Sequence, residues 1–146
     1  MVMPESGYLR FAALTIQRQM DDLERELRGA SEDADIEFVH RSRVASRRLR
    51  ASLGTFYDCL PKDKRKVWMR TVKGVTRSLG EARDLDVQIE FLMSYISKKE
   101  DDASLHRLLA SLCKKRNLAQ ASVDRSVKEL IEEGALRSLK DWCDDS

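Results

Sequence analysis

Residues 38–60 of the chain read FVHRSRVASRRLRASLGTFYDCL, and this stretch decides the fold. At about 100° per residue, its apolar side chains fall within one arc of about 80° on a helix, and most of its cationic side chains share a second arc about 145° away. The apolar arc holds Phe38, Ala45, Leu49, Leu53, Phe56 and Leu60, and the cationic arc holds His40, Arg43, Arg47 and Arg50. A helix with one apolar face buries it against other helices, so the stretch predicts a domain of packed helices.

The same apolar period runs through the rest of the chain. The predicted helices span about 8–28, 35–60, 62–97, 102–133 and, for a short final one, 135–142. Gly29 and Gly134 are placed to end helices, and Asp35 is placed to cap the second helix. Gly80 is expected to bend the third helix. The predicted architecture is an all-α antiparallel four-helix bundle with a short extra C-terminal helix, in a single domain over 1–146.

The composition excludes several classes of protein. Of 146 residues, 42% are apolar and 36% are charged, and six Gly and two Pro are too few turn residues for a many-stranded sandwich or barrel. No apolar run approaches the roughly 18 residues of a membrane span, and the first residues lack the pattern of a signal peptide. Cys59, Cys113 and Cys143 form no metal-ligand spacing and no disulfide framework, which is typical of a reducing cytoplasm.

The net charge of +2 conceals a strongly uneven distribution. Residues 1–39 carry four basic and nine acidic side chains, and residues 84–146 carry ten and thirteen. Residues 40–83 carry thirteen basic and three acidic side chains, a net charge of +10. The central third therefore favours an anionic partner.

Cationic residues also oppose the apolar face of the third predicted helix. Lys66, Arg70, Lys73 and Arg77 are spaced i, i+4, i+7 and i+11, within an arc of about 60°. Like charges at this spacing repel by roughly a few tenths of a kcal/mol per pair, so the arrangement favours a site that holds an anion. Because Arg and Lys both donate to phosphate oxygens, two such helices side by side predict a groove for a linear polyanion.

Arg116 lies within the apolar stripe of the fourth predicted helix, between Leu112 and Ala119. A buried guanidinium is costly unless it is paired. Two interpretations remain open: Arg116 extends past the core or pairs with an acid such as Asp84, or it points into a charged cavity between helices.

Two motifs resemble the CHAD domain, a family named for a conserved histidine in an α-helical domain. Residues 39–50, VHRSRVASRRLR, resemble the family's V-H-x-x-R-V-A-x-R-R-L-R signature with every fixed position filled. Residues 78–87, SLGEARDLDV, resemble its L-G-x-x-R-D-L-D-V motif. The order and separation of the motifs fit the family as well.

The resemblance implies a helical domain that binds inorganic polyphosphate without catalysis or a cofactor. The implied polyphosphate ligands are His40, Arg43, Arg47, Arg50, Lys73, Arg77, Arg83 and, by a looser match, Arg116. Asp84 and Asp86 are expected to orient Arg side chains or cap a bend near Gly80. Members of the family are associated with polyphosphate granules, so the resemblance also implies a cytoplasmic location at such granules. The domain often accompanies a triphosphate-hydrolysing CYTH domain, so the resemblance implies a CYTH-type phosphohydrolase as partner.

The chain departs from the family in one respect. Full members resemble two pseudo-symmetric four-helix halves, each with a basic motif, whereas here the motif occurs once. The chain therefore resembles the N-terminal half. A homodimer would rebuild the second half by two-fold symmetry, and a monomeric mass at micromolar concentration would argue against it.

Three other functions compete with this interpretation. An enzyme is disfavoured because the chain has two His, no recognisable catalytic grouping and no Gly-rich phosphate loop. A metal site is only weakly supported because Asp84 and Asp86 diverge by about 200° on a helix. RNA or DNA binding is the closest alternative, but stacking of bases needs aromatic residues in the basic stripes, and only Tyr57 lies near one. A purely structural bundle leaves the aligned like charges unexplained.

Overall fold

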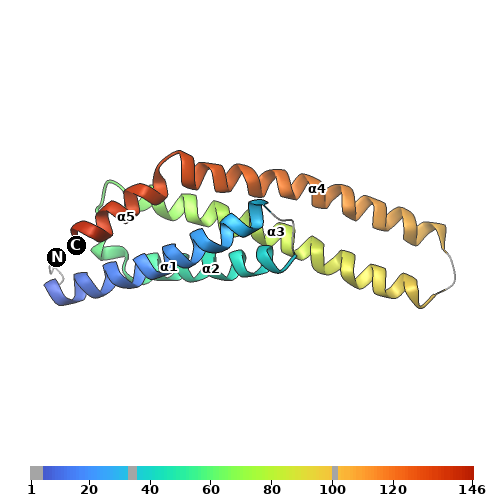
Figure 1. Cartoon of the computed structure of the whole chain (residues 1–146), viewed down its shortest axis with the longest axis horizontal. Coiled ribbons are helices and arrows are strands. Elements are labelled where there is room, and N and C mark those ends of the chain that lie inside the picture. The colour runs from blue at the N-terminus through green and yellow to red at the C-terminus, as the bar shows by residue number, and fades with distance from the viewer. Residues whose placement is uncertain (1–4, 33–35, 100–101) are drawn as a thin grey trace.

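A computed structural model describes residues 5–32, 36–99 and 102–146, and every regular element in these ranges is helical (Figure 1). The elements are α1 (Ser6–Glu32), α2 (Ile36–Thr55), the single 3-10 turn η1 (Tyr57–Cys59), α3 (Arg65–Ser97), α4 (Ala103–Glu132) and α5 (Ala135–Asp145). The predicted all-α class and the short C-terminal helix are confirmed. The predicted cap at Asp35 lies outside the described residues.

The prediction that Gly29 ends the first helix is wrong, because α1 continues to Glu32. Gly29 instead allows α1 and α2 to approach each other closely. A Cβ atom at this position would lie 2.3 Å from a ring carbon of Phe38, so the aromatic ring occupies the space that a side chain would need. An ion pair of 3.1 Å between Arg41 and Glu26 joins the same two helices, which run antiparallel.

The second helix ends earlier than predicted, at Thr55. The chain then makes the 3-10 turn η1 and a further turn in which the backbone N–H groups of Lys64 and Arg65 donate to the carbonyl of Pro61. Phe56 and Leu60 still reach the core, so the apolar pattern of this segment is correct although its last residues are not α-helical. The next helix, α3, runs without interruption through Gly80.

The core lies between the apolar stripes of all five helices. Its fully buried side chains include Ile16, Met20, Leu23, Leu49, Leu53, Leu79, Leu130 and Leu139. On α2 two serines are also buried, Ser42 and Ser46, and their small size allows α2 to pack closely against its neighbours. Each consecutive pair of the first four helices is in contact, and α5 contacts α1, α3 and α4.

Helix α5 folds back along α1 at the end of the molecule that holds both termini (Figure 1). Gly134 makes this reversal possible, because its φ of 88° belongs to the left-handed region that favours glycine. Leu136, Leu139 and Cys143 are buried beneath the helix, and the indole of Trp142 packs 6.3 Å from that of Trp68.

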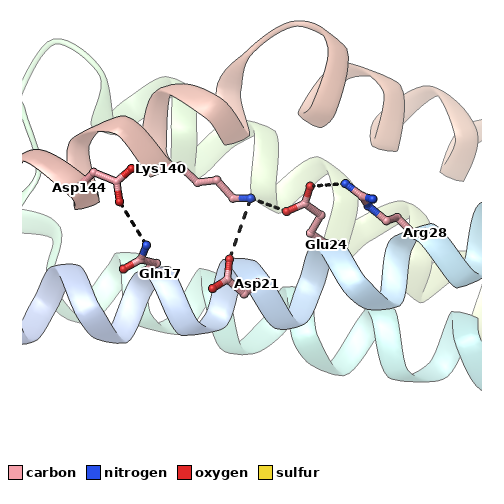
Figure 2. Close-up of polar contacts among 6 residues, drawn as sticks. All are labelled: Gln17, Asp21, Glu24, Arg28, Lys140 and Asp144. Atoms are coloured by element: carbon pink, nitrogen blue, oxygen red, sulfur yellow. Dashed lines mark hydrogen bonds and ion pairs between the residues drawn. The ribbon is translucent and has the colours of Figure 1, made fainter.

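A row of polar contacts fastens α5 to α1 (Figure 2). Lys140 donates to Glu24 and lies 4.0 Å from Asp21, and Gln17 donates to Asp144 at 3.2 Å. Glu24 also accepts from Arg28 at 3.0 Å. The hydrogen bond from Lys140 and, more weakly, the one from Arg28 hold the pKa of Glu24 below its ordinary value, although its partial burial acts in the opposite direction.

Helices α3 and α4 form a long hairpin that projects beyond the ends of α1 and α2 (Figure 1). The two helices run antiparallel, since Ser78 donates to Ser126 and Arg116 donates to Asp86. In the projecting part, the predicted core residues Leu105, Leu109 and Leu112 are only half-buried. The reason is that two helices cannot fully cover each other's apolar stripes. None of the described helices is long and apolar enough to cross a membrane.

The contact between α5 and α1 predicts a pH-dependent stability. Because the pKa of Glu24 is lower in the folded chain than its ordinary value of 4.5, its contribution is complete above that pH and is lost as the pH falls through the folded-state pKa. Lys140→Met should lower the free energy of unfolding by about 1 kcal/mol near pH 7 and by much less near pH 3. Urea unfolding at both pH values measures this.

Lys128→Met is the matched control, because Lys128 forms an exposed pair with Glu132 within α4 at 3.9 Å. Its effect should stay below about 0.5 kcal/mol at either pH. A loss for Lys140→Met that does not change between the two pH values would contradict the role assigned to Glu24.

Candidate functional site

The contact between α2 and α3 sets the predicted cationic stripe of α2 beside Lys73 and Arg77 of the predicted stripe on α3. Arg65 at the start of α3 donates to the carbonyl of Tyr57 at 3.3 Å, and one helical length away the Nε of Arg43 lies 3.6 Å from the position that a Cβ of Gly80 would take. The two helices are therefore antiparallel neighbours in a fixed register. This register places Arg83 at the level of His40, Arg77 at the level of Arg47, and Lys73 at the level of Arg50.

We call this row of side chains the basic seam. It consists of His40, Arg43, Arg47 and Arg50 of α2 and Lys73, Arg77 and Arg83 of α3. Arg47, Arg50, Lys73 and Arg77 are exposed, whereas His40, Arg43 and Arg83 are half-buried. From His40 to Arg50 the seam is about 15 Å long, at 1.5 Å per residue. The seam is accessible to a ligand along its length and deepest at the end near His40.

Little negative charge from the protein opposes the seam. In the described part of the chain, Arg77 is the only member with a carboxylate within 4 Å, namely Glu81 at 3.6 Å. Both side chains of that pair are more than half exposed, so the pair contributes little. Arg41, which lies off the predicted stripe, is turned toward α1 and is paired with Glu26. Of the two α2 arginines outside the seam, Arg41 is thus compensated by α1, whereas the exposed Arg48 makes no ion pair in the described part of the chain.

Gly80 shapes the middle of the seam, and the sequence alone did not indicate this role. The glycine leaves the surface of α3 open where Arg43 crosses it, because the Nε of Arg43 lies 3.6 Å from the position that a Cβ would take. Any side chain longer than a methyl group would displace the guanidinium of Arg43. Gly80 therefore positions a cation between the two helices.

His40 contributes a polar atom that has no partner in the described part of the protein. Its Nδ1 is buried and makes no hydrogen bond there, and the same holds for the hydroxyl of Ser42. A buried polar atom without a partner costs free energy, so a ligand oxygen that reached His40 would remove this cost. The imidazole can therefore serve as a hydrogen-bonding group beside the guanidinium groups.

Arg116 lies apart from the basic seam, on the α4 side of α3. Its Nε donates to Asp86 at 2.6 Å and its guanidinium donates to Gln120 at 3.0 Å. The side chains of Arg116 and Asp86 are 14% and 7% exposed, so the charge of Arg116 is compensated inside the protein. Of the two interpretations left open by the sequence, pairing with an acid is confirmed, although the partner is Asp86 and not Asp84, which is exposed.

Within residues 5–32, 36–99 and 102–146, no group of three or more His, Cys, Asp or Glu side chains is placed to hold a metal ion. Burial raises the pKa of the Cys143 thiol to about 12, so this cysteine acts as a core residue.

The aromatic residues of α2 and η1 are covered by cations of the protein itself. The guanidinium of Arg65 lies 4.2 Å from the ring centre of Tyr57, and that of Arg41 lies 4.5 Å from the ring centre of Phe38. Tyr57 was the one aromatic residue that the sequence placed near a basic stripe. Because Arg65 occupies a face of its ring, Tyr57 is poorly placed to stack on a base.

Comparison with known proteins gives one match. The family model described as the CHAD domain matches residues 14–146, which is most of the chain and includes every residue of the basic seam. No curated protein and no solved structure matches the chain.

The pair between Arg116 and Asp86 predicts an asymmetry between two neighbouring acids. Asp86→Asn should lower the free energy of unfolding by about 2–3 kcal/mol, because it leaves a largely buried guanidinium without its counter-charge. Asp84→Asn should change it by less than about 0.5 kcal/mol, because Asp84 is exposed. Urea unfolding of the two variants checks both values, and equal losses would show that Asp86 is not the specific partner of Arg116.

Proposed function

The chain belongs to the CHAD domain family, and from this membership we propose that it binds inorganic polyphosphate along the basic seam. The observation that carries the proposal is the seam itself: seven potential donors from two antiparallel helices form one row, with a single weak ion pair to a carboxylate of the described residues. A linear polyanion that lies along α2 and α3 would contact several of these donors at once.

The residue types suit phosphate oxygens. Arg offers a planar fork of donors and Lys a compact charge, and hydrogen bonds between charged partners are about twice as strong as neutral ones. Arg47, Arg50, Lys73 and Arg77 are exposed and can approach the ligand from both helices. His40 and Arg43 lie deeper and would contact oxygens that enter between the helices.

The proposed mechanism is multivalent charge pairing, which has two consequences. Each additional phosphate raises the effective concentration of the next one at the seam, so affinity should rise with chain length until the seam is filled. Each neutralised phosphate also releases counterions, so affinity should fall steeply as salt increases. Arg116 is proposed to support the site from α4 without being a main ligand, since Asp86 compensates its charge.

Binding of RNA or DNA is the alternative that shares most of this physics. Proteins that bind single strands place aromatic rings among the cations, because base stacking contributes about 1–3 kcal/mol per base. Along the seam the nearby rings of Phe38 and Tyr57 are already stacked with Arg41 and Arg65. A polyanion without bases therefore suits the seam better than a nucleic acid does.

The binding is proposed to be non-catalytic, because charge pairing at the seam requires no proton transfer and no nucleophile. On the family's known associations we also propose a location at cytoplasmic polyphosphate granules, a CYTH-type phosphohydrolase as partner, and a homodimer that presents two basic seams. An unchanged length distribution of polyphosphate after incubation with the protein would support the non-catalytic part, and shortened chains would contradict it.

Reversal of one central charge tests the seam directly. Arg47→Glu should weaken the binding of medium-chain polyphosphate by about tenfold or more and reduce the slope of log affinity against log salt by about one to two. The matched control is Arg10→Glu, which makes the same change of net charge at an exposed position of α1. Calorimetric titration of both variants measures this, and equal losses would mean that polyphosphate senses only the overall charge.

A pair of glycines tests the position of Arg43. Gly80→Leu should weaken polyphosphate binding by about threefold to tenfold, because the new side chain displaces the Arg43 guanidinium from its place on α3. Gly74→Leu makes the same substitution in the same helix at a position where a Cβ meets nothing within 4 Å. It should leave affinity unchanged while both variants gain helix propensity. Unchanged affinity for Gly80→Leu would remove Arg43 from the ligand set.

A further inference from the structure

The projecting part of the hairpin carries an unusual concentration of exposed apolar side chains. Phe91 is 72% exposed, Leu118 is 65% exposed and Leu108 is 49% exposed, and Val87 and Tyr95 are exposed as well. Phe91, Tyr95 and Leu108 lie in the part of α3 and α4 in which the predicted core stripe is only half-buried, and Leu118 follows that part on α4. The hairpin thus presents apolar surface on its outside as well as on its inside.

Helical geometry places the exposed apolar residues of α3, Val87, Phe91 and Tyr95, on one face of that helix. At about 100° per residue, Phe91 and Tyr95 fall within about 40° of Asp84, and more than about 60° from the α4-facing residue Leu92. The same arc contains, in chain order, Asp84, Val87, Gln88, Phe91, Tyr95 and Lys98, all of which are exposed. We call this arc the hairpin face.

Charge is distributed along the hairpin face in an ordered way. Its N-terminal end is acidic, with Asp84 and with Glu81 one turn earlier, its centre is apolar at Phe91, and its tip is basic at Lys98 and Lys99. Asp84 and Lys98 stand seven residues on either side of Phe91. Within the described part of the chain neither makes an ion pair, whereas Lys99 lies over the ring of Tyr95 at 5.5 Å.

A surface of this kind is complementary to an antiparallel copy of itself. A two-fold axis that passes at the level of Phe91 brings the Asp84 of one chain to the Lys98 of the other, and it does so twice. It also brings the two Phe91 rings together at the axis, where aromatic pairs are favourable. A parallel arrangement would instead set acid against acid and lysine against lysine.

We infer that the hairpin face is the interface of a homodimer in which the α3–α4 hairpins of two copies pack antiparallel, with Phe91 at the two-fold axis. Antiparallel packing of two such hairpins brings four helices together and covers Phe91 and Tyr95 of both copies. The groove of about 470 Å³ between α3 and α4, which Asp84, Lys115 and Leu118 help to line, lies where the partner's tip would arrive. The inference rests on the hairpin residues and stands whether or not the seam binds polyphosphate.

The size of the face sets the expected strength. From Asp84 to Lys99 the hairpin face is about 22 Å long, and together with α4, whose Leu118 lines the same groove as Asp84, the interface is about 20 Å wide, which gives about 450 Å² per copy and about 900 Å² in total. Interfaces of this size belong to reversible assemblies, so the dimer should form at about 10–100 µM. The partner's tip would reach only as far as Arg83, so the exposed cations at Lys73 and Arg77 stay open to a ligand.

Sedimentation of the full chain between about 5 µM and about 500 µM tests the inference. The weight-average mass should rise from 16.8 kDa toward twice that value. Phe91→Glu should remain monomeric throughout, and Leu14→Glu, which changes a 54% exposed residue of α1 in the same way, should dimerise like the unchanged chain. A monomer at every concentration, or equal behaviour of the two variants, would overturn the inference.

A charge exchange tests the antiparallel register. Asp84→Lys and Lys98→Glu should each weaken dimerisation by about tenfold, because each places like charges opposite one another twice. The double variant should recover most of the lost affinity, because it restores two opposite-charge pairs. Both residues are exposed, so thermal unfolding of all three variants should match that of the unchanged chain. A double variant no tighter than the single ones would exclude this register.

Discussion

The structure depends on how closely α2 packs between α1 and α3. The apolar arc of α2 is buried, with Leu49 and Leu53 completely covered, while the arc about 145° away carries like charges that repel one another. Burial of a leucine side chain contributes about 1.5–3 kcal/mol, whereas repulsion of one like-charge pair at i,i+4 costs about a few tenths of a kcal/mol. The packing of α2 therefore holds the cations of the seam in line at an acceptable cost.

Small residues make this packing possible. Ser42 and Ser46 are fully buried on α2, Gly29 admits the ring of Phe38 on the α1 side, and Gly80 admits Arg43 on the α3 side. A glycine inside a helix costs about 1 kcal/mol relative to alanine. At Gly29 that cost is offset by a close contact that no other residue allows, and at Gly80 the open surface leaves room for the guanidinium of Arg43. The side chain of Arg43 in α2 can thus lie against α3 because the backbone of α3 is uncovered at Gly80.

Sequence periodicity predicts most of the fold, because apolar side chains at helical spacing must be buried together. It identifies the buried faces of α1, α2 and α3 and the left-handed break at Gly134. It fails where a local signal has two physical readings, since Gly29 is equally suited to end a helix or to admit a ring. It also fails at Leu105, Leu109 and Leu112, because a stripe of leucines does not say whether a third helix is present to cover it.

The candidate site shows the same division. The cationic arcs of α2 and α3 are visible in the sequence, but their register depends on the contacts of Arg43 with Gly80 and of Arg65 with Tyr57, which are tertiary. Spacing places Arg116 in an apolar stripe but cannot choose between Asp84 and Asp86 as its partner. That choice follows from burial, because only Asp86 faces the interior.

The central claim is that the seam recognises a phosphate chain without bases. Its most direct test is a pair of calorimetric titrations, with medium-chain polyphosphate and with single-stranded RNA of matched charge, at the same ionic strength. The account predicts that polyphosphate binds at least about tenfold more tightly, because the seam offers cations without free aromatic rings for stacking. Equal or tighter binding of RNA would contradict it and make a nucleic acid the ligand of the basic seam.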